Sequence, residues 1–257
     1  MSEVHVITCG ASLLTNFSRS TSVEDFLQRY SNLKDLGDPS KNEKFLRELS
    51  KEEREILKGA ILQYLIQDPR RASAEMNSLF GYIEDVRKED VLNIKNLISE
   101  IHLIRSDTEV GRLAADVLYE YLNSLGLNVS VHVVSGFGSG DFDLAIENLV
   151  NKVRGVVKFS GRDKVVFNLT GGYKPEVAAM AVLAAENDIE QYYIHEASRK
   201  TVTLPSISKL KVRMTKWEKL LMVLAMLMNF PLNMDPLEMG LKLTLTAAIV
   251  WIAYKRV

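Results

Sequence analysis

Residues 163–176, DKVVFNLTGGYKPE, constrain the fold of this chain more than any other segment. A short apolar run at residues 165–167 is followed by Gly171 and Gly172, and an apolar pattern with helical spacing begins at Val177. An order of strand, glycine turn and helix is typical of proteins that alternate strands with helices around a parallel sheet. We therefore expect an α/β fold.

The same order recurs along the chain. Apolar, β-rich runs are predicted to form strands at residues 4–8, 101–104, 129–134, 165–167, 191–195 and 201–204. Helical patterns follow at residues 110–122, 144–157 and 177–186, with Asp107 or Thr108 as the cap of the first. This alternation predicts a Rossmann-like parallel sheet with helices on both faces.

Small, hydroxyl-bearing or cationic residues stand where these strands end. Because the carboxyl ends of parallel strands share one edge of a sheet, Ser12, Arg105, Ser135, Thr170 and Lys174 should lie along one rim. Ligands of open α/β sheets bind at this edge. The sequence therefore predicts a binding site there.

The Gly171-Gly172 turn suits an anion. Adjacent glycines let backbone N–H groups approach a ligand, Pro175 fits a first helical turn, and Lys174 adds a point charge. The spacing is neither that of a Walker A loop nor that of the dinucleotide fingerprint. A phosphate site and an ordinary turn that binds nothing both remain open at this point.

Two segments depart from the alternation. Residues 23–98 are too long for a simple crossover and are predicted as a helical insert with helices near 42–49, 51–66, 73–86 and 91–99. Ser50 and Glu53 there resemble a capping box. Arg70 and Arg71 are interpreted as surface charges, with ligand contact as the alternative.

The end of the chain changes character. We expect a domain over residues 1–205 and a helical hairpin over residues 206–257, with helices at 215–230 and 237–254. Neither half offers eighteen uncharged apolar residues, so we expect burial against the domain or a partner rather than a membrane span. A hairpin lying on a membrane surface is the alternative.

The charge and the residue composition of the chain bear on its partners, its compartment and its cofactors. The net charge of -1 argues against duplex nucleic acid as a partner, although a small anion needs only a local positive rim. Cys9 is the single cysteine, so no internal disulfide forms, and no secretory signal is visible; we expect a cytoplasmic protein. No histidine, cysteine and carboxylate cluster has metal-ligand spacing, and we expect no metal and no cofactor.

Three motifs taken together carry a family resemblance. ITCGASLLTNF at residues 7–17, IRSDTEVGRLAADVL at 104–118 and NLTGGYKPE at 168–176 resemble the CARF family, the CRISPR-associated Rossmann-fold sensors of cyclic oligoadenylates. The resemblance covers residues 1 to about 205 and is strongest to the archaeal ring nucleases of type III CRISPR systems. It implies catalytic roles for Ser12 and Lys174 and a ligand contact for Arg105.

The rest of the ligand site follows from the same resemblance and from the strand ends. The expected ligand-binding residues are Gly10, Ala11, Arg105, Ser106, Asp107, Thr108, Ser135, Gly136, Phe137, Thr170, Gly171, Gly172 and Tyr173.

The resemblance implies an enzyme that binds cyclic tetra-adenylate and cleaves it without a metal. A ribose 2′-hydroxyl would attack the adjacent phosphodiester, leaving linear products with 2′,3′-cyclic phosphate ends and switching off type III CRISPR signalling. We expect a homodimer with the ligand on its two-fold axis. The sequence offers no general base for this reaction.

Two other functions stay open. A non-catalytic sensor would bind the ring without cleaving it and act through the C-terminal hairpin at a partner, and a membrane-linked effector would use the hairpin at a bilayer. A fused ribonuclease of the HEPN type is disfavoured, because it needs an Arg followed closely by a His, and residues 196–257 contain no histidine.

Overall fold

A computed structural model of the chain describes residues 2–20, 33–38, 40–160, 164–195 and 200–204. Within these residues, six strands form a single sheet in the order β3-β2-β1-β4-β5-β6. The strands are β1 (Glu3–Thr8), β2 (Ile98–Ser106), β3 (Val129–Val134), β4 (Lys164–Asn168), β5 (Glu190–Ile194) and β6 (Thr201–Leu204). All neighbouring pairs are parallel except β5 and β6, which are antiparallel. The predicted Rossmann-like α/β fold is confirmed.

The strand order contains a reversal beside β1. The chain runs from β1 through β2 to β3 on one side, and β4 and β5 then continue from β1 on the other side. At such a switch point the connections after the two central strands diverge and leave a crevice at their carboxyl ends. The segments that follow β1 and β4 therefore occupy the position where open sheets of this kind bind ligands.

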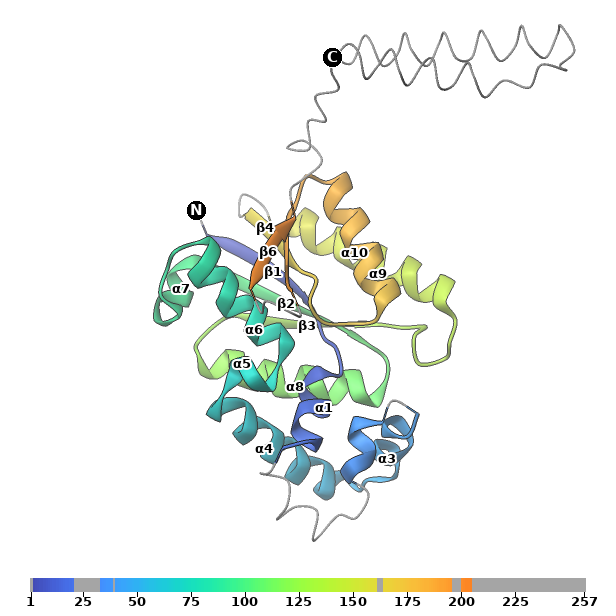
Figure 1. The fold of residues 1–257 in the computed structure, drawn as a ribbon. Helices are drawn as coiled ribbons and strands as arrows, with labels where there is room; N and C mark the ends of the chain where they lie inside the picture. The colour runs from blue at the N-terminus through green and yellow to red at the C-terminus, as the bar shows by residue number, and fades with distance from the viewer. Residues whose placement is uncertain (1, 21–32, 39, 161–163, 196–199, 205–257) are drawn as a thin grey trace, which may run out of the picture. The chain divides into compact units, whose positions relative to one another are not determined.

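Helices cover both faces of the sheet (Figure 1). Helices α1 (Ser12–Ser18), α4 (Lys51–Gln67), α6 (Ala74–Gly81) and α8 (Glu109–Ser124) contribute to one hydrophobic cluster, which includes Ile7 of β1 and Leu103 of β2. Helices α9 (Phe142–Phe159) and α10 (Lys174–Glu186) form the other cluster with Val6 and Ile104. Alternate residues of each central strand thus enter opposite cores, as expected for strands buried on both faces.

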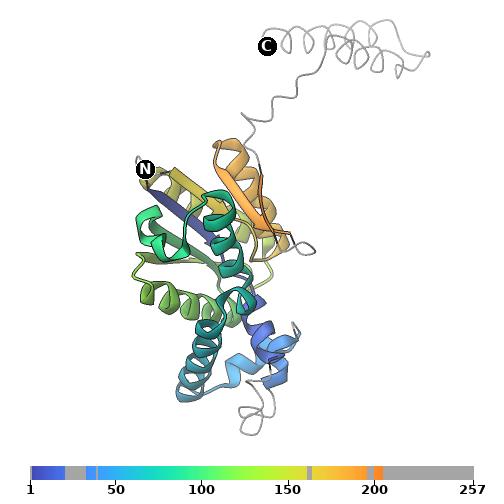
Figure 2. The same cartoon turned by 60° about the vertical axis from the view of Figure 1, so that its left-hand side comes forward.

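The insert between β1 and β2 is helical where the structure describes it. Besides α4 and α6 it holds η2 (Leu33–Gly37), α3 (Asn42–Glu48), α5 (Pro69–Ala72), the π-helical turn η3 (Tyr82–Val86), η4 (Val91–Asn93) and α7 (Ile94–Leu97). The predicted capping box of α4 is present: Glu53 N donates to Ser50 Oγ at 3.2 Å, and Ser50 N donates to Glu53 at 2.8 Å. Figure 2 shows α8 beside one face of the sheet, with the insert helix α4 next to α8.

The insert is fastened to the amino-terminal end of the sheet by polar and aromatic contacts. Arg87 forms an ion pair with the buried Glu3 of β1, and it also lies 3.5 Å from Glu190 of β5. Tyr82 stacks on Tyr192 with ring centroids 4.3 Å apart. The insert therefore packs against the sheet over β1 and β5 and is not a detached appendage.

The exact bounds of some predicted elements differ from those in the structure. The sequence placed residues 98 and 99 in a helix, but α7 ends at Leu97, and β2 begins at Ile98, which pairs with Glu3. Helix α10 begins at Lys174, three residues before the apolar pattern, because Tyr173 already has the extended conformation of an N-cap. The expected C-terminal hairpin lies outside the described residues.

Candidate functional site

The loops that follow β1 and β4 touch at the switch point. We call residues 9–12 the β1 loop and residues 169–173 the β4 loop. Thr8 Oγ1 donates a 2.5 Å hydrogen bond to the carbonyl of Gly171, and a Cβ built on Gly10 would lie 2.7 Å from the backbone nitrogen of Gly172. Only glycine permits this approach at position 10. The structure thus joins the two motifs that contain Ser12 and Lys174.

Ser12 is the first residue of α1, and its hydroxyl is held on two sides. Its Oγ donates to Glu75 Oε2 at 2.9 Å and accepts from the backbone N–H of Ala74 at 3.2 Å. Both partners belong to the start of α6 in the insert. The orientation of this serine is therefore set by a segment more than sixty residues away.

Glu75 is a residue that sequence reasoning missed. Its side chain is fully buried, and it also accepts from Gly10 N at 2.8 Å and from Ser73 Oγ at 2.7 Å. In the sequence it looked like an ordinary acidic residue in a first helical turn, where carboxylates complement the helix dipole. The only local signal was the Ser73 cap two residues earlier.

Lys174 opens α10 on the other side of the contact. Gly172 adopts a φ of 96°, a left-handed conformation that glycine accepts without strain. Tyr173 then forms the N-cap, and Lys174 and Pro175 occupy the first turn with the lysine exposed. The strand, glycine turn and helix start predicted here are confirmed.

Glu176 is a second buried carboxyl group that the sequence did not single out. Its side chain is 1% exposed, Oε2 accepts from Tyr173 N at 3.1 Å, and Oε1 has no hydrogen-bond partner among the described residues. Burial raises the pKa of this carboxyl to about 7, while the bond from Tyr173 lowers it. A carboxyl that changes charge near neutral pH thus lies two residues from Lys174.

The residues after β2 are largely engaged with one another. Thr108 caps α8 by accepting from Gly111 N at 3.0 Å, and Ser106 and Thr108 share a 2.6 Å hydrogen bond. Asp107 accepts from the amides of Gly136 at 3.0 Å and Gly138 at 2.6 Å. These side chains shape the rim by holding the loop after β3.

Arg105 keeps an unused donor. It is half-buried, its Nη1 donates to the Ser106 carbonyl at 2.9 Å, and its shielded Nε has no partner in the described parts of the chain. Buried donors normally have partners, so this Nε is an exception among the described residues.

The loops after β3 and β4 meet through two rings. Phe137 and Tyr173 stack with centroids 5.5 Å apart and an interplanar angle of 16°. Phe137 is buried, whereas Tyr173 is 45% exposed and offers its outer surface to solvent. Ser135 is exposed beside this pair, and the Thr170 hydroxyl accepts from Ile194 N at 3.2 Å, which ties the β4 loop to β5.

The predicted rim is confirmed as an arrangement of strand ends. Strands β1 to β4 are parallel, so their carboxyl ends lie at one edge of the sheet. Arg105 is the next-to-last residue of β2, and Ser12, Ser135, Thr170 and Lys174 lie in the segments that follow β1, β3 and β4. Ala11 contributes no side-chain cap to α1, and its methyl group packs against the core.

A cavity rich in arginine lies beside Ser12. We call this space of about 430 Å³ the arginine cavity; its lining includes Asn16, Arg19, Tyr64, Arg70, Arg71 and Ala74. Ala74 is the residue whose N–H reaches Ser12, and Asn16 lies one helical turn after Ser12 on α1. The cavity and the Ser12 site therefore share Ala74, although Ser12 itself does not line the cavity.

The charge of the arginine cavity is only partly neutralised. Arg70 lies 2.6 Å from Glu84 and over the ring of Phe80, as expected for a surface charge. Arg19 and Arg71 have no carboxylate within ion-pair distance in the described part of the chain. As far as the described residues go, an anion in this cavity would meet two arginines without an ion-pair partner.

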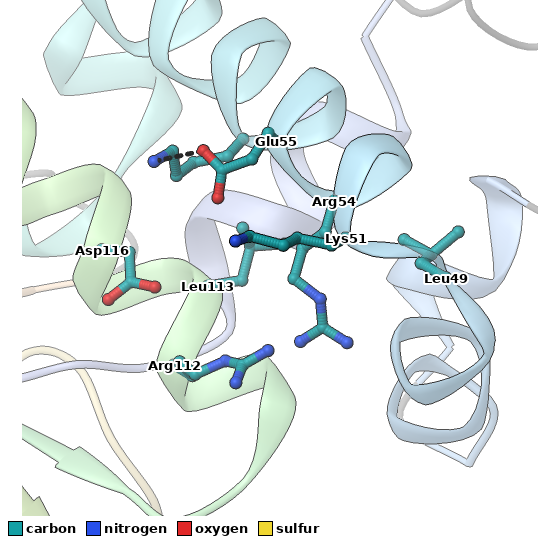
Figure 3. A pocket seen from close by; sticks show the side chains of 8 residues that line it. Leu49, Lys51, Arg54, Glu55, Arg112, Leu113 and Asp116 are labelled. Atoms are coloured by element: carbon teal, nitrogen blue, oxygen red, sulfur yellow. Dashed lines mark ion pairs between the residues drawn. The ribbon is translucent and has the colours of Figure 1, made fainter.

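A second cavity, of about 470 Å³, lies between α4 and α8 (Figure 3). Its cations are mostly paired: Arg54 and Arg112 both reach Glu109, and Lys58 lies 2.8 Å from Glu55 and from Glu120. Because these charges are compensated, this cavity offers less to an anion than the arginine cavity does.

The described residues offer neither a metal site nor a membrane span. Among these residues, no three histidine, cysteine, aspartate or glutamate side chains gather as metal ligands. In the same part of the chain, no helix has the length and apolar character needed to cross a bilayer.

The chain matches a known protein family over more than half of its length. Residues 70–207, more than half of the sequence, match the family described as CRISPR-associated protein (Cas_APE2256). The chain belongs to this family. The matched residues include the insert from Arg70 of α5 onward, strands β2 to β6 and the β4 loop with Lys174. Strand β1 and Ser12 precede the matched residues.

Proposed function

We propose that this CRISPR-associated protein is a ring nuclease that opens cyclic tetra-adenylate. The observation that carries the proposal is the contact between the β1 and β4 loops at the switch point, with an oriented Ser12 hydroxyl on one side and the helix start at Lys174 on the other. A helix N-terminus with a lysine attracts a phosphate. The CRISPR-associated family and the motif resemblance to CARF proteins agree with a cyclic oligoadenylate as that phosphate ligand.

The proposed reaction is a transesterification within the ligand. A ribose 2′-oxygen attacks the neighbouring phosphorus, and the 5′-oxygen leaves, which yields a 2′,3′-cyclic phosphate and a 5′-hydroxyl. Lys174 stabilises the negative charge that grows on the phosphoryl group or on the leaving oxygen. Ser12 orients the attacking hydroxyl, and the crevice holds attacking and leaving oxygens in line.

The surrounding groups suit the rest of such a ligand. Arg19 and Arg71 of the arginine cavity would meet phosphates, and the exposed face of Tyr173 would stack on an adenine. The motif resemblance implies a further ligand contact for the half-buried Arg105. This reading revises the interpretation of Arg71 as a surface charge, and it leaves Arg70 paired.

The first test is incubation with cyclic tetra-adenylate in excess chelator. We expect linear products that carry 2′,3′-cyclic phosphate ends, separated by chromatography and identified by mass. Undiminished cleavage in chelator is expected because the proposed chemistry uses only side chains. Binding without products would favour the sensor alternative, and activity that needs added magnesium or manganese would reject the mechanism.

A second expectation concerns assembly. A ring with repeated phosphates suits a site shared by two identical subunits, so we propose a homodimer with the ligand on the two-fold axis. Light scattering at micromolar protein, with and without cyclic tetra-adenylate, should give the mass of a dimer. A monomeric mass with ligand bound would contradict this arrangement.

A further inference from the structure

The hydrogen bonds around Ser12 restrict what its hydroxyl can do. A serine hydroxyl has one hydrogen to donate and two lone pairs to accept with. The hydrogen is directed to Glu75 Oε2 at 2.9 Å, and one lone pair accepts from Ala74 N at 3.2 Å. The capacity that remains is one lone pair, so Ser12 is prepared to accept a hydrogen from a ligand rather than to donate one to a phosphate.

The hydrogen of Ser12 ends on a carboxylate that only accepts. Glu75 Oε1 takes the amide hydrogen of Gly10 at 2.8 Å, and Oε2 takes the hydroxyl hydrogens of Ser12 and Ser73 at 2.9 and 2.7 Å. Its side chain is fully buried. Solvent therefore does not compete for these oxygens, and the path from a ligand hydroxyl through Ser12 to Glu75 is short and continuous.

We propose that Glu75 is the proton acceptor of the ring-opening reaction and acts through Ser12. This inference rests on the proposed ring-nuclease function and supplies the general base that the sequence did not reveal. Glu75 does not touch the ligand; it is a positioning residue that also takes the proton. The helical insert is thereby a working part of the site.

The proton and electron movements balance within the groups present. The 2′-hydroxyl gives its proton to Ser12 Oγ, while Ser12 gives its own proton to Glu75 Oε2. The 2′-oxygen forms a bond to phosphorus, the bond from phosphorus to the 5′-oxygen breaks, and that oxygen keeps the electron pair and takes a proton from the Lys174 ammonium. After the product leaves, Glu75 returns its proton to Ser12 Oγ, Ser12 passes its own proton to water that enters the emptied site, and Lys174 regains one from solvent.

The test replaces the carboxylate by an amide of the same shape. In Glu75→Gln the amide oxygen keeps the Gly10 bond, but the amide nitrogen faces Ser12 as a donor and cannot take its hydrogen. With cyclic tetra-adenylate we expect the dissociation constant to stay within about threefold. The single-turnover cleavage rate should fall on the order of a hundredfold, the size of a general-base contribution.

The dependence of the cleavage rate on deuterium content distinguishes proton transfer to Glu75 from a purely structural role of Glu75. Rates of the wild-type protein in mixtures of light and heavy water should curve with deuterium content, because the two relay protons move together with the one from Lys174. The curvature should decrease in Glu75→Gln, where the relay to position 75 is lost. Ser73→Ala is the matched control: it removes another donor to the same Oε2 and the cap of α6 but leaves the Ser12–Glu75 bond. We expect it to cleave within about fivefold of wild type.

Each outcome decides the matter. Wild-type cleavage with an unchanged Glu75→Gln rate would overturn the role of Glu75 alone, and so would equal losses in Glu75→Gln and Ser73→Ala. If Glu75→Gln does not fold, a straight-line dependence on deuterium in the wild type overturns the proposal, and a curved one supports it. If the wild type leaves cyclic tetra-adenylate intact, the proposed function fails and this inference falls with it.

Discussion

Replacing Lys174 by alanine should lower the cleavage rate of cyclic tetra-adenylate by a hundredfold or more. The transition state concentrates charge at one phosphorus, where loss of a preorganised donor costs roughly 3–4 kcal/mol. Binding of the intact ring is spread over several phosphates and bases, and one exposed charge contributes at most about 1 kcal/mol. We therefore expect the dissociation constant to rise less than tenfold, measured by single-turnover kinetics beside equilibrium binding.

Lys152→Ala is the matched control for that experiment. Lys152 is an exposed lysine on α9, so its removal changes the net charge equally without touching the switch point. The control should bind and cleave as the wild type does. A Lys174→Ala protein that cleaves at the wild-type rate would remove this residue from the mechanism, and its ammonium would be an ordinary solvated charge at a helix start.

Glu176→Gln should stabilise the protein at alkaline pH. Burial raises the pKa of the Glu176 carboxyl from an ordinary value of 4.5 to about 7, so folding favours its neutral form. The resulting stability is fully present below about pH 4.5 and is lost as the pH rises through 7. A neutral amide escapes this loss, which approaches 3 kcal/mol at pH 8 by the usual conversion of pKa differences.

The measurement is unfolding of both proteins as a function of pH. At pH 8 the glutamine variant should melt on the order of 5–10 °C higher, and at pH 5 the difference should shrink to about 1 kcal/mol or less. Glu147→Gln serves as control, because Glu147 is exposed on α9 and its replacement should change stability by less than about 0.5 kcal/mol. A gain at pH 8 that persists unchanged at pH 5 would show that titration of Glu176 is not its cause.

Much of the fold could be predicted because its strands and helix starts follow from local sequence patterns. Apolar runs such as residues 129–134 and 201–204 mark strands whose bounds agree with β3 and β6. The Gly171-Gly172 turn followed by Pro175 predicts a helix start, and α10 begins at Lys174, between this turn and Pro175. Parallel strands then bring their carboxyl ends to one edge, so the rim with Ser12 and Lys174 could be foreseen without knowledge of any contact.

Other features of the site depend on contacts between distant segments. Glu75 meets Gly10 and Ser12 only because the insert folds back over the face of the sheet that α1 covers. Its local sequence, an acidic residue behind a serine cap, is common in exposed helix starts and carries no sign of burial. Likewise, both carboxylate oxygens of Asp107 accept hydrogen bonds from the loop after β3, and spacing along the chain does not reveal this pairing.

Local patterns are sufficient to predict the α/β class, the edge of the sheet that carries the candidate site, and the two motifs that meet there, because periodicity and turn chemistry act over a few residues. Which polar groups are buried, and what they bond, depends on contacts between distant segments. Burial depends on how the insert and α10 pack, and packing converts ordinary glutamates into a proton acceptor candidate at Glu75 and a group with a raised pKa at Glu176. The properties of these two carboxyl groups therefore arise from desolvation and long-range hydrogen bonding, which no local pattern encodes.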